Sequence, residues 1–257
     1  MLRFIEFTIP NIVRITMPSY ALFACIGLLC MMLLVYFRIQ RIEIEFKKYL
    51  LLILCVAVGV GIGSKLLFII TKIPDIATDF TWQKTLQIII TSGFVFYGGL
   101  FGAIMGLYIF AKVSGLSFGM LANITVPSFP LFHMWGRIGC FFAGCCYGKE
   151  ASWGIALESD PGVPRIPIQL IESGCNLGIL LILLYLEKTK RDNGRLLYIY
   201  LCLYSICRLI LEIFRGDVIR GIWAGVSTSQ WISIGLFVAS SFFLWTQKSV
   251  SKTYTKC

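Results

Sequence analysis

The chain has 257 residues, of which 58% are hydrophobic and 14% charged, and its formal net charge is +10. The basic residues are not gathered into one stripe with interleaved aromatic residues, so the charge does not indicate binding to nucleic acid. The apolar residues form runs that are too long for soluble helices, which alternate apolar and polar faces. Composition therefore excludes an ordinary soluble domain and predicts an all-α, polytopic membrane protein.

The apolar runs predict about seven transmembrane helices. Ser19 to Phe37 contains no charged residue, and about twenty such residues match the roughly 30 Å of bilayer hydrocarbon. No repeat or soluble domain stands out, so residues 1–257 are expected to form a single integral membrane domain. The residues before Ser19 mix apolar and polar side chains and are expected along the membrane interface. The predicted spans lie near 19–37, 49–70, 94–111, 119–136, 168–186, 196–214 and 229–246.

The distribution of basic residues predicts the orientation. Seven spans place the termini on opposite sides, and cytoplasmic loops are the ones enriched in Lys and Arg. The opposite loops hold fewer basic residues, mixed with acidic ones. We therefore expect the N-terminus outside, the C-terminus in the cytoplasm, and a cytoplasmic location for Arg38, Arg41, Lys47, Lys48, Lys112, Lys188, Lys190, Arg191, Arg195, Lys248, Lys252 and Lys256.

The sixth predicted span concentrates polar side chains. Tyr204, Arg208, Glu212 and Arg215 are spaced by four, four and three residues, which places them on one helical face. An ionisable group inside a span costs about 2.5–3.5 kcal/mol, so this face is expected to avoid lipid. An internal Arg208–Glu212 pair is one explanation, and a functional cavity is the other.

Other spans place polar residues at the same predicted outer level. Tyr97 lies near the start of the third span, Arg137 at the end of the fourth, and Gln169 and Glu172 at the start of the fifth, while Gln230 begins the seventh. Arg137 alone has a simpler explanation, because arginine often anchors a helix end at the lipid head groups. The shared level of all these residues favours a common polar cavity.

Two glycine-rich segments have both a structural and a functional interpretation. Gly98 and Gly99 stand near a helix start, where backbone N–H groups bind anions, but small residues also allow close packing of helices. Gly139 belongs to a segment, 136–148, in which glycines and Arg137 suit a phosphate. The same segment holds Cys140, Cys145 and Cys146. Their spacing is not a standard zinc pattern, so no metal site is predicted. A disulfide from Cys140 to Cys145 or Cys146 on the outer side is the stronger minor hypothesis.

At these residues the chain resembles the prolipoprotein diacylglyceryl transferase family, and the similarity is colinear over most of the chain. Five segments carry it: Tyr97-Gly98-Gly99-Leu100 resembles H-G-G-L, Gly136-Arg137-Ile138-Gly139 resembles the start of G-R-x-G-N-F, Pro167-x-Gln169-Leu170-x-Glu172 resembles P-x-Q-L-Y-E, and the polar residues at 204–215 and 227–233 match the last two helices. The chain departs from the family at three positions: Tyr97 replaces a histidine, Cys140 an asparagine and Cys145 a glutamate.

The resemblance implies a transferase of the bacterial cytoplasmic membrane. Such an enzyme moves a diacylglyceryl group from phosphatidylglycerol to the lipobox cysteine in the signal peptide of a preprolipoprotein, with membrane lipids as its other partners. It needs neither a cofactor nor nucleic acid. The expected catalytic residues are Tyr97, Arg137, Arg208 and Glu212. The expected substrate-binding residues are Gly98, Gly99, Gly139, Cys140, Gln169, Glu172, Tyr204, Arg215 and Gln230.

Three alternatives remain open at this stage. The first is a related transferase with another lipid donor or acceptor, which the three departures from the family would allow. The second is a phospholipid-binding or transport protein without catalysis. The third is a thiol-redox protein that uses the cysteines of segment 136–148.

Overall fold

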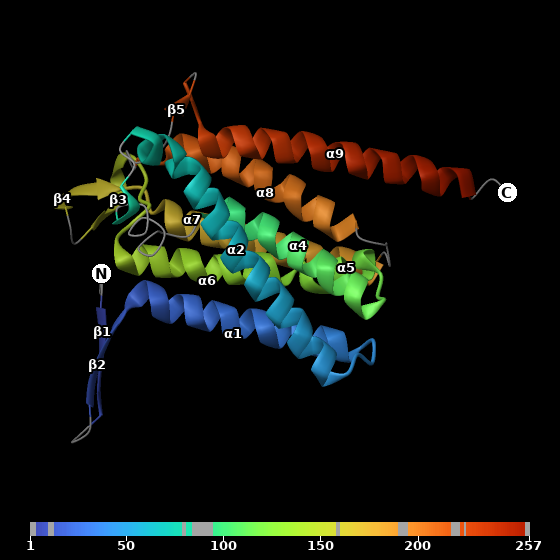
Figure 1. The fold of residues 1–257 in the computed structure, drawn as a ribbon. Helices are drawn as coiled ribbons and strands as arrows, with labels where there is room; N and C mark the ends of the chain where they lie inside the picture. The colour runs from blue at the N-terminus through green and yellow to red at the C-terminus, as the bar shows by residue number, and fades with distance from the viewer. Residues whose placement is uncertain are drawn as a thin grey trace. The chain divides into compact units, whose positions relative to one another are not determined.

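The computed structural model describes residues 4–9, 13–78, 81–83, 95–157, 160–189, 195–216, 222–223 and 225–254. Its secondary structure is mainly helical, which confirms the all-α membrane class (Figure 1). Residues 79–80, 84–94, 190–194 and 217–221, which include parts of three predicted loops, lie outside the described residues. Lys190, Arg191 and Lys256 lie outside them too. The long helices are α1 (Ser19–Gln40), α2 (Phe46–Thr78), α4 (Phe96–Ser114), α7 (Ile168–Thr189), α8 (Arg195–Phe214) and α9 (Thr228–Tyr254).

Five of these helices, α1, α2, α4, α7 and α8, are long and apolar enough to cross a bilayer. Many of their large apolar side chains point outward. Leu54 and Leu181 are both 58% exposed, and Leu29 is equally so. Such side chains avoid water, and hydrocarbon is the solvent that accepts them. The chain is therefore a multi-pass membrane protein.

The fourth predicted span, 119–136, differs from the structure. It comprises two helices, α5 (Phe118–Thr125) and α6 (Ser128–Ala143). Pro127 has no N–H to donate, and its ring would clash with the carbonyl of Asn123 in a continuous helix. The Ser128 hydroxyl donates instead to the Thr125 carbonyl at 2.6 Å. Arg137 consequently lies inside α6 rather than at the end of a span.

Among the described residues, short strands form three antiparallel pairs. The N-terminal residues, expected along the interface, pair as β1 (Phe4–Ile9) and β2 (Val13–Pro18), with Phe4 opposite Pro18. β3 (Glu150–Leu157) pairs with β4 (Asp160–Arg165) in the segment that joins α6 to α7. β5 (Ile222–Trp223) pairs with β6 (Val226–Ser227) immediately before α9. Aromatic and β-branched residues in the N-terminal pair favour strands.

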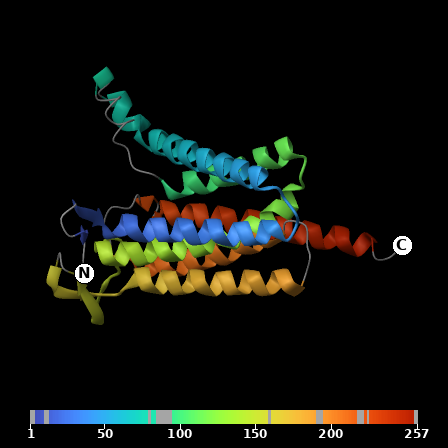
Figure 2. The same ribbon diagram turned by 90° about the horizontal axis from the view of Figure 1, so that it is seen from below.

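The chain divides into two compact units. Unit 1 comprises residues 1–35 and 123–257, and unit 2 comprises residues 36–122. In unit 1, α7 packs on both α6 and α8, and α8 packs on α9. Figures 1 and 2 both show these four helices running alongside one another. The prediction of a single integral domain stays a prediction.

In unit 2, α2 and α4 approach so closely that their backbones touch. A Cβ atom on Gly102 would fall on the carbonyl oxygen of Gly59, and one on Gly98 would fall on that of Gly63. A Cβ on Gly106 would meet the Cys55 carbonyl in the same way. The contact of Gly98 confirms the helix-packing interpretation of that glycine. We call the contact lined by these residues the glycine seam.

Candidate functional site

The predicted polar face of α8 is present and buried. Tyr204, Arg208 and Glu212 are 3%, 6% and 5% exposed, and Arg215 follows the last residue of the helix at 8%. Arg208 Nη2 lies 2.7 Å from Glu212 Oε2, one turn later on the same helix. The same nitrogen donates to Ser229 Oγ of α9 at 3.3 Å. The intrahelical pair expected from the spacing therefore exists, and it also has partners outside α8.

The first two turns of α7 hold a second buried polar group. Glu172 is 3% exposed, and Asn176 Nδ2 donates to its backbone carbonyl at 2.8 Å. Ser173 Oγ donates to the Met134 carbonyl of α6 at 3.1 Å. Gln169 Nε2 donates to the Cys145 carbonyl at 2.7 Å. The start of α7 is thus hydrogen-bonded both to α6 and to the segment that follows α6.

Glu172 is the point at which three helices meet. Its Oε1 atom lies 3.1 Å from Arg137 Nη2 of α6 and 3.7 Å from Arg208 Nη1 of α8. Arg137 is the most accessible of the three side chains, at 15% exposed against 7% for Arg208 and 4% for Glu172. The sequence predicted a shared polar cluster for Arg137 and Arg208, and the structure brings both guanidinium groups to one carboxylate oxygen.

His133 also belongs to this cluster, although it was not among the predicted site residues. It lies one turn before Arg137 on α6, and Arg137 Nε donates to His133 Nε2 at 3.2 Å. Because that nitrogen accepts a hydrogen bond, the imidazole is neutral with its proton on Nδ1. Its 3.6 Å separation from Glu172 Oε1 is too long for a hydrogen bond. The four-residue spacing from Arg137 was the available signal, since it places both residues on one helical face.

The cluster around Glu172 joins opposite charges from three helices. Arg137 and Arg208 both contact the Glu172 carboxylate, and Arg208 also contacts Glu212. Guanidinium groups bind carboxylate and phosphate oxygens through charge-assisted hydrogen bonds. The arrangement is therefore suited to an anionic ligand that reaches the two arginines.

Cys140, Cys145 and Cys146 adjoin this cluster and are the residues of the described chain that could hold a metal ion. All three are free thiols, and their sulfur atoms lie within 4.8 Å of one another. Hydrogen bonds from Cys140 and then Cys145 lower the pKa of the Cys146 thiol below its usual value, and the charges of Arg137 and Arg215 act in the same direction.

Some predicted binding residues have structural roles. Gly139 packs against α1, where a Cβ would lie 3.1 Å from Phe23 Cβ. Gln230 forms a capping box at the start of α9: its Oε1 accepts the Ser227 N–H at 3.0 Å, while its own N–H donates to Ser227 Oγ at 3.2 Å. These contacts explain the residue types without a ligand, and the binding roles of Gly139 and Gln230 stay predictions.

Tyr97, Gly98 and Gly99 belong to unit 2, in the first turn of α4. Tyr97 is 8% exposed. Gly98 belongs to the glycine seam, and a Cβ on Gly99 would lie 2.8 Å from Ser64 Oγ. Helix packing thus accounts for both glycines. The catalytic role of Tyr97 and the binding roles of the glycines stay predictions.

Comparison with known proteins decides the family. The model of the family described as prolipoprotein diacylglyceryl transferase matches residues 8–246. The chain belongs to this family. A phosphatidylglycerol–prolipoprotein diacylglyceryl transferase of Clostridium tetani is 35% identical over 188 residues, covering 69% of this chain and 74% of the relative. A second, from Clostridium perfringens, is 34% identical over 69% of this chain and 70% of its own length.

The match to the prolipoprotein diacylglyceryl transferase family also extends over nearly the whole chain at lower identity. A relative of the same name from Dehalococcoides mccartyi is 27% identical over 238 residues, which is 89% of both chains. The polar cluster on α6, α7 and α8 lies within the matched residues. The family resemblance found in the sequence is thus confirmed.

Proposed function

We propose that this protein transfers the diacylglyceryl group of phosphatidylglycerol to the lipobox cysteine in the signal peptide of a preprolipoprotein. The observation that carries the proposal is the convergence of Arg137 and Arg208 on one oxygen of Glu172. Two guanidinium groups so placed can bind one phosphate through several charge-assisted hydrogen bonds. Family membership supports the same substrate class.

The donor lipid fits the cluster. A phosphodiester carries one negative charge, and guanidinium groups bind such an anion through charge-assisted hydrogen bonds. Arg137 is the most accessible of the ion-paired side chains around Glu172 and would meet the phosphate first. Two buried acceptors, Gln169 Oε1 and Asn176 Oδ1, receive no hydrogen bond from the described residues. They are suited to hydroxyl donors such as those of a glycerol head group.

The proposed reaction forms one bond and breaks one bond. The sulfur of the substrate cysteine attacks the glyceryl carbon that carries the phosphate, a C–S bond forms, and the C–O bond breaks with release of glycerol phosphate. The leaving phosphate gains a second negative charge as the bond breaks. Arg137 and Arg208 stabilise that charge more than the charge of the intact lipid, and this difference lowers the barrier.

The thiol proton requires an acceptor. We assign this role to Glu212 or Tyr97, and we assign orientation of the head group to Tyr204, whose side chain is buried beside the His133 ring. Glu212 is already paired with Arg208. Binding of the lipid phosphate by Arg208 would weaken that pair and make the carboxylate a better base.

The location of the cluster supports action at one membrane surface. Glu172 and Ser229 lie near the starts of α7 and α9, whereas Glu212 lies near the end of α8. These termini belong to the side that the basic loops predict to be external. We propose that the protein resides in the bacterial cytoplasmic membrane with its N-terminus outside and its C-terminus in the cytoplasm.

The test is a reconstituted transfer reaction. The purified chain is incorporated into vesicles with labelled phosphatidylglycerol and a lipobox peptide, and lipidated peptide is quantified by mass spectrometry. Arg137→Ala and Arg208→Ala should each lower the rate about 10²–10³-fold, the usual cost of losing one donor to a developing oxyanion. Arg165→Ala is the matched control, because Arg165 pairs with the exposed Glu150 on the β3–β4 hairpin. No lipidated peptide from the unaltered chain would reject the proposal.

Tyr97, Cys140 and Cys145 favour a second candidate, a transferase with another donor or acceptor. Each occupies a position where the family pattern has a different residue type. The same vesicles, supplied with a mixture of phospholipids and several thiol peptides, distinguish the two functions. Consumption of a lipid other than phosphatidylglycerol would select the second candidate.

A further inference from the structure

The end of α6 brings two thiols together through its backbone. The Gly144 N–H donates to the Phe141 carbonyl at 3.2 Å, and the Cys145 N–H donates to the Cys140 carbonyl at 3.2 Å. With Gly144 at φ +71°, these bonds define a Schellman motif. In this motif the side chains that occupy the positions of Cys140 and Cys145 face each other, and an apolar pair is usual there. Here both positions hold a thiol.

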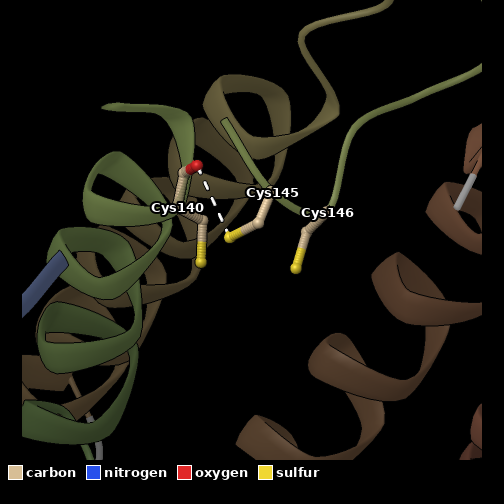
Figure 3. A group of neighbouring side chains, drawn as sticks. All are labelled: Cys140, Cys145 and Cys146. Atoms are coloured by element: carbon tan, nitrogen blue, oxygen red, sulfur yellow. Dashed lines mark hydrogen bonds between the residues drawn. The ribbon is translucent and has the colours of Figure 1, made fainter. Parts of the chain in front are cut away.

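The third thiol is held by an unusual backbone conformation. Cys146 has φ +59°, in the left-handed region that residues other than glycine seldom adopt. This conformation directs Cys146 toward the other two side chains, and Figure 3 shows the three sulfur atoms facing a common space. Such a conformation costs of order 1 kcal/mol and persists where the surrounding structure holds it.

The segment after Cys146 is fixed at several points. The Gly148 N–H donates to the Ile166 carbonyl at 3.0 Å, and the Lys149 N–H donates to the Phe214 carbonyl at 2.8 Å. The Gly216 N–H donates to the Tyr147 carbonyl at 3.1 Å. Gln169 fixes the Cys145 carbonyl from α7. The three thiols are therefore held at a defined place on the structure rather than on a free loop.

The dimensions suit a metal ion with thiolate ligands. Zinc–sulfur bonds of about 2.3 Å place three sulfurs about 3.8–4.0 Å apart. The sulfurs of Cys140, Cys145 and Cys146 lie within 4.8 Å of one another, so small side-chain rotations bring them to that spacing. We propose that these three cysteines form a binding site for a thiophilic d¹⁰ cation such as Zn²⁺.

The surroundings supply charge balance and access. Binding of Zn²⁺ releases the protons that the three thiols still carry and leaves a site of charge −1, made of one dication and three thiolates. Arg137 and Arg215 act electrostatically on Cys146 and offset that charge. Cys145 is exposed, so the ion has a path into the site, whereas Cys140 is buried. Three protein ligands leave one coordination position for water or another ligand.

The experiment measures metal binding by the full chain, independently of transferase activity. Reduced protein in detergent is titrated with Zn²⁺ and with Cd²⁺, whose thiolate bonds absorb in the ultraviolet. We expect one equivalent bound per chain, release of protons, and protection of all three cysteines from alkylation in residue-resolved mass spectrometry. A variant with Cys140→Ser, Cys145→Ser and Cys146→Ser should lose the site. The matched control, with Cys25→Ser, Cys30→Ser and Cys55→Ser, should keep it.

The single variant Cys145→Ala tests the site with less risk to folding, because this side chain is exposed. It should weaken binding of Cd²⁺ more than about 10-fold, since losing a ligand costs at least as much as losing a second-shell partner. Absence of stoichiometric binding would overturn the proposal. So would equal binding by the two triple variants, or a disulfide among these cysteines in protein isolated under alkylating conditions. Protection of the three cysteines from alkylation is measured on the unaltered chain, so it tests the proposal even if the variants fail to fold.

Discussion

The polar cluster of unit 1 and the glycine seam of unit 2 bring apolar helices together in opposite ways. In unit 1, the ion pairs of Glu172 with Arg137 and Arg208 join α6, α7 and α8 through long side chains. In unit 2, α2 and α4 meet through backbone atoms with no side chain between them. The first contact is sensitive to the loss of a partner, because a buried charge is then left alone. The contact in unit 2 is sensitive to any added side-chain atom, because that atom would overlap the backbone of the other helix.

Gly102→Leu should have the largest effect and would break the glycine seam. The added side chain would overlap the Gly59 carbonyl, and backbone cannot yield as a flexible side chain does. We expect almost no folded protein, measured as the monodisperse fraction in detergent. Gly61→Leu is the control, because a Cβ at Gly61 meets nothing within 4 Å. Equal recovery of the two variants would show that the seam does not depend on close packing.

Glu172→Ala should have the next largest effect and acts on the cluster of unit 1. It removes the carboxylate that Arg137 and Arg208 share, leaving two buried cations without it. Removing one partner of a buried ion pair costs about 3–5 kcal/mol. Equilibrium unfolding in mixed micelles measures the change. If phosphate neutralises the same arginines, added phosphatidylglycerol should restore part of the loss, and no restoration would count against an anion site.

Ser227→Ala should have a moderate effect on the start of α9. It removes the hydroxyl that accepts the Gln230 N–H and so breaks the capping box. Loss of such a cap costs about 1 kcal/mol. The same unfolding measurement applies, with Ser227→Asn as the control, because asparagine also caps helices. A decrease in the free energy of unfolding as large as that for Glu172→Ala would mean that Ser227 does more than cap the helix.

Glu150→Ala should have the smallest effect and shows what burial adds to an ion pair. Its partner Arg165 lies 3.3 Å away, but Glu150 is 68% exposed. Exposed pairs contribute about 0–1 kcal/mol, because water and salt screen them. We expect a change below about 0.5 kcal/mol in the free energy of unfolding. A change in the free energy of unfolding near that for Glu172→Ala would show that burial does not distinguish the two ion pairs.

The sequence predicted the elements whose signals are periodic. The spacing from Tyr204 to Arg215 predicted the buried face of α8, and the small residues Gly98 and Gly99 indicated close packing of their helix against another. The face of α8 follows from 3.6 residues per turn, so it does not depend on knowing the partner helix. The apolar run at 168–186 predicted where the fifth span begins, and so placed Gln169 and Glu172 near its outer end.

Other features depended on tertiary contacts or on single residues. The apolar run from 119 to 136 hides the break at Pro127, because a hydropathy pattern does not record a missing N–H. His133 was not selected because its neighbourhood is apolar in sequence, whereas Glu172, which it approaches, lies 39 residues away. The sequence prediction that the cysteines bind no metal rested only on their spacing along the chain. Gly144 after an apolar helix was the signal of a motif that brings Cys140 and Cys145 together.

The hydrogen bond from Gln169 to the Cys145 carbonyl links the three cysteines to the start of α7. Glu172 lies three residues after Gln169, in the same rigid first turns of α7. A cation on the thiols and an anion on the arginines would therefore act on one short stretch of helix. Thermodynamic linkage requires the two effects to be equal: the factor by which the cation changes the affinity for the anion is the factor by which the anion changes the affinity for the cation.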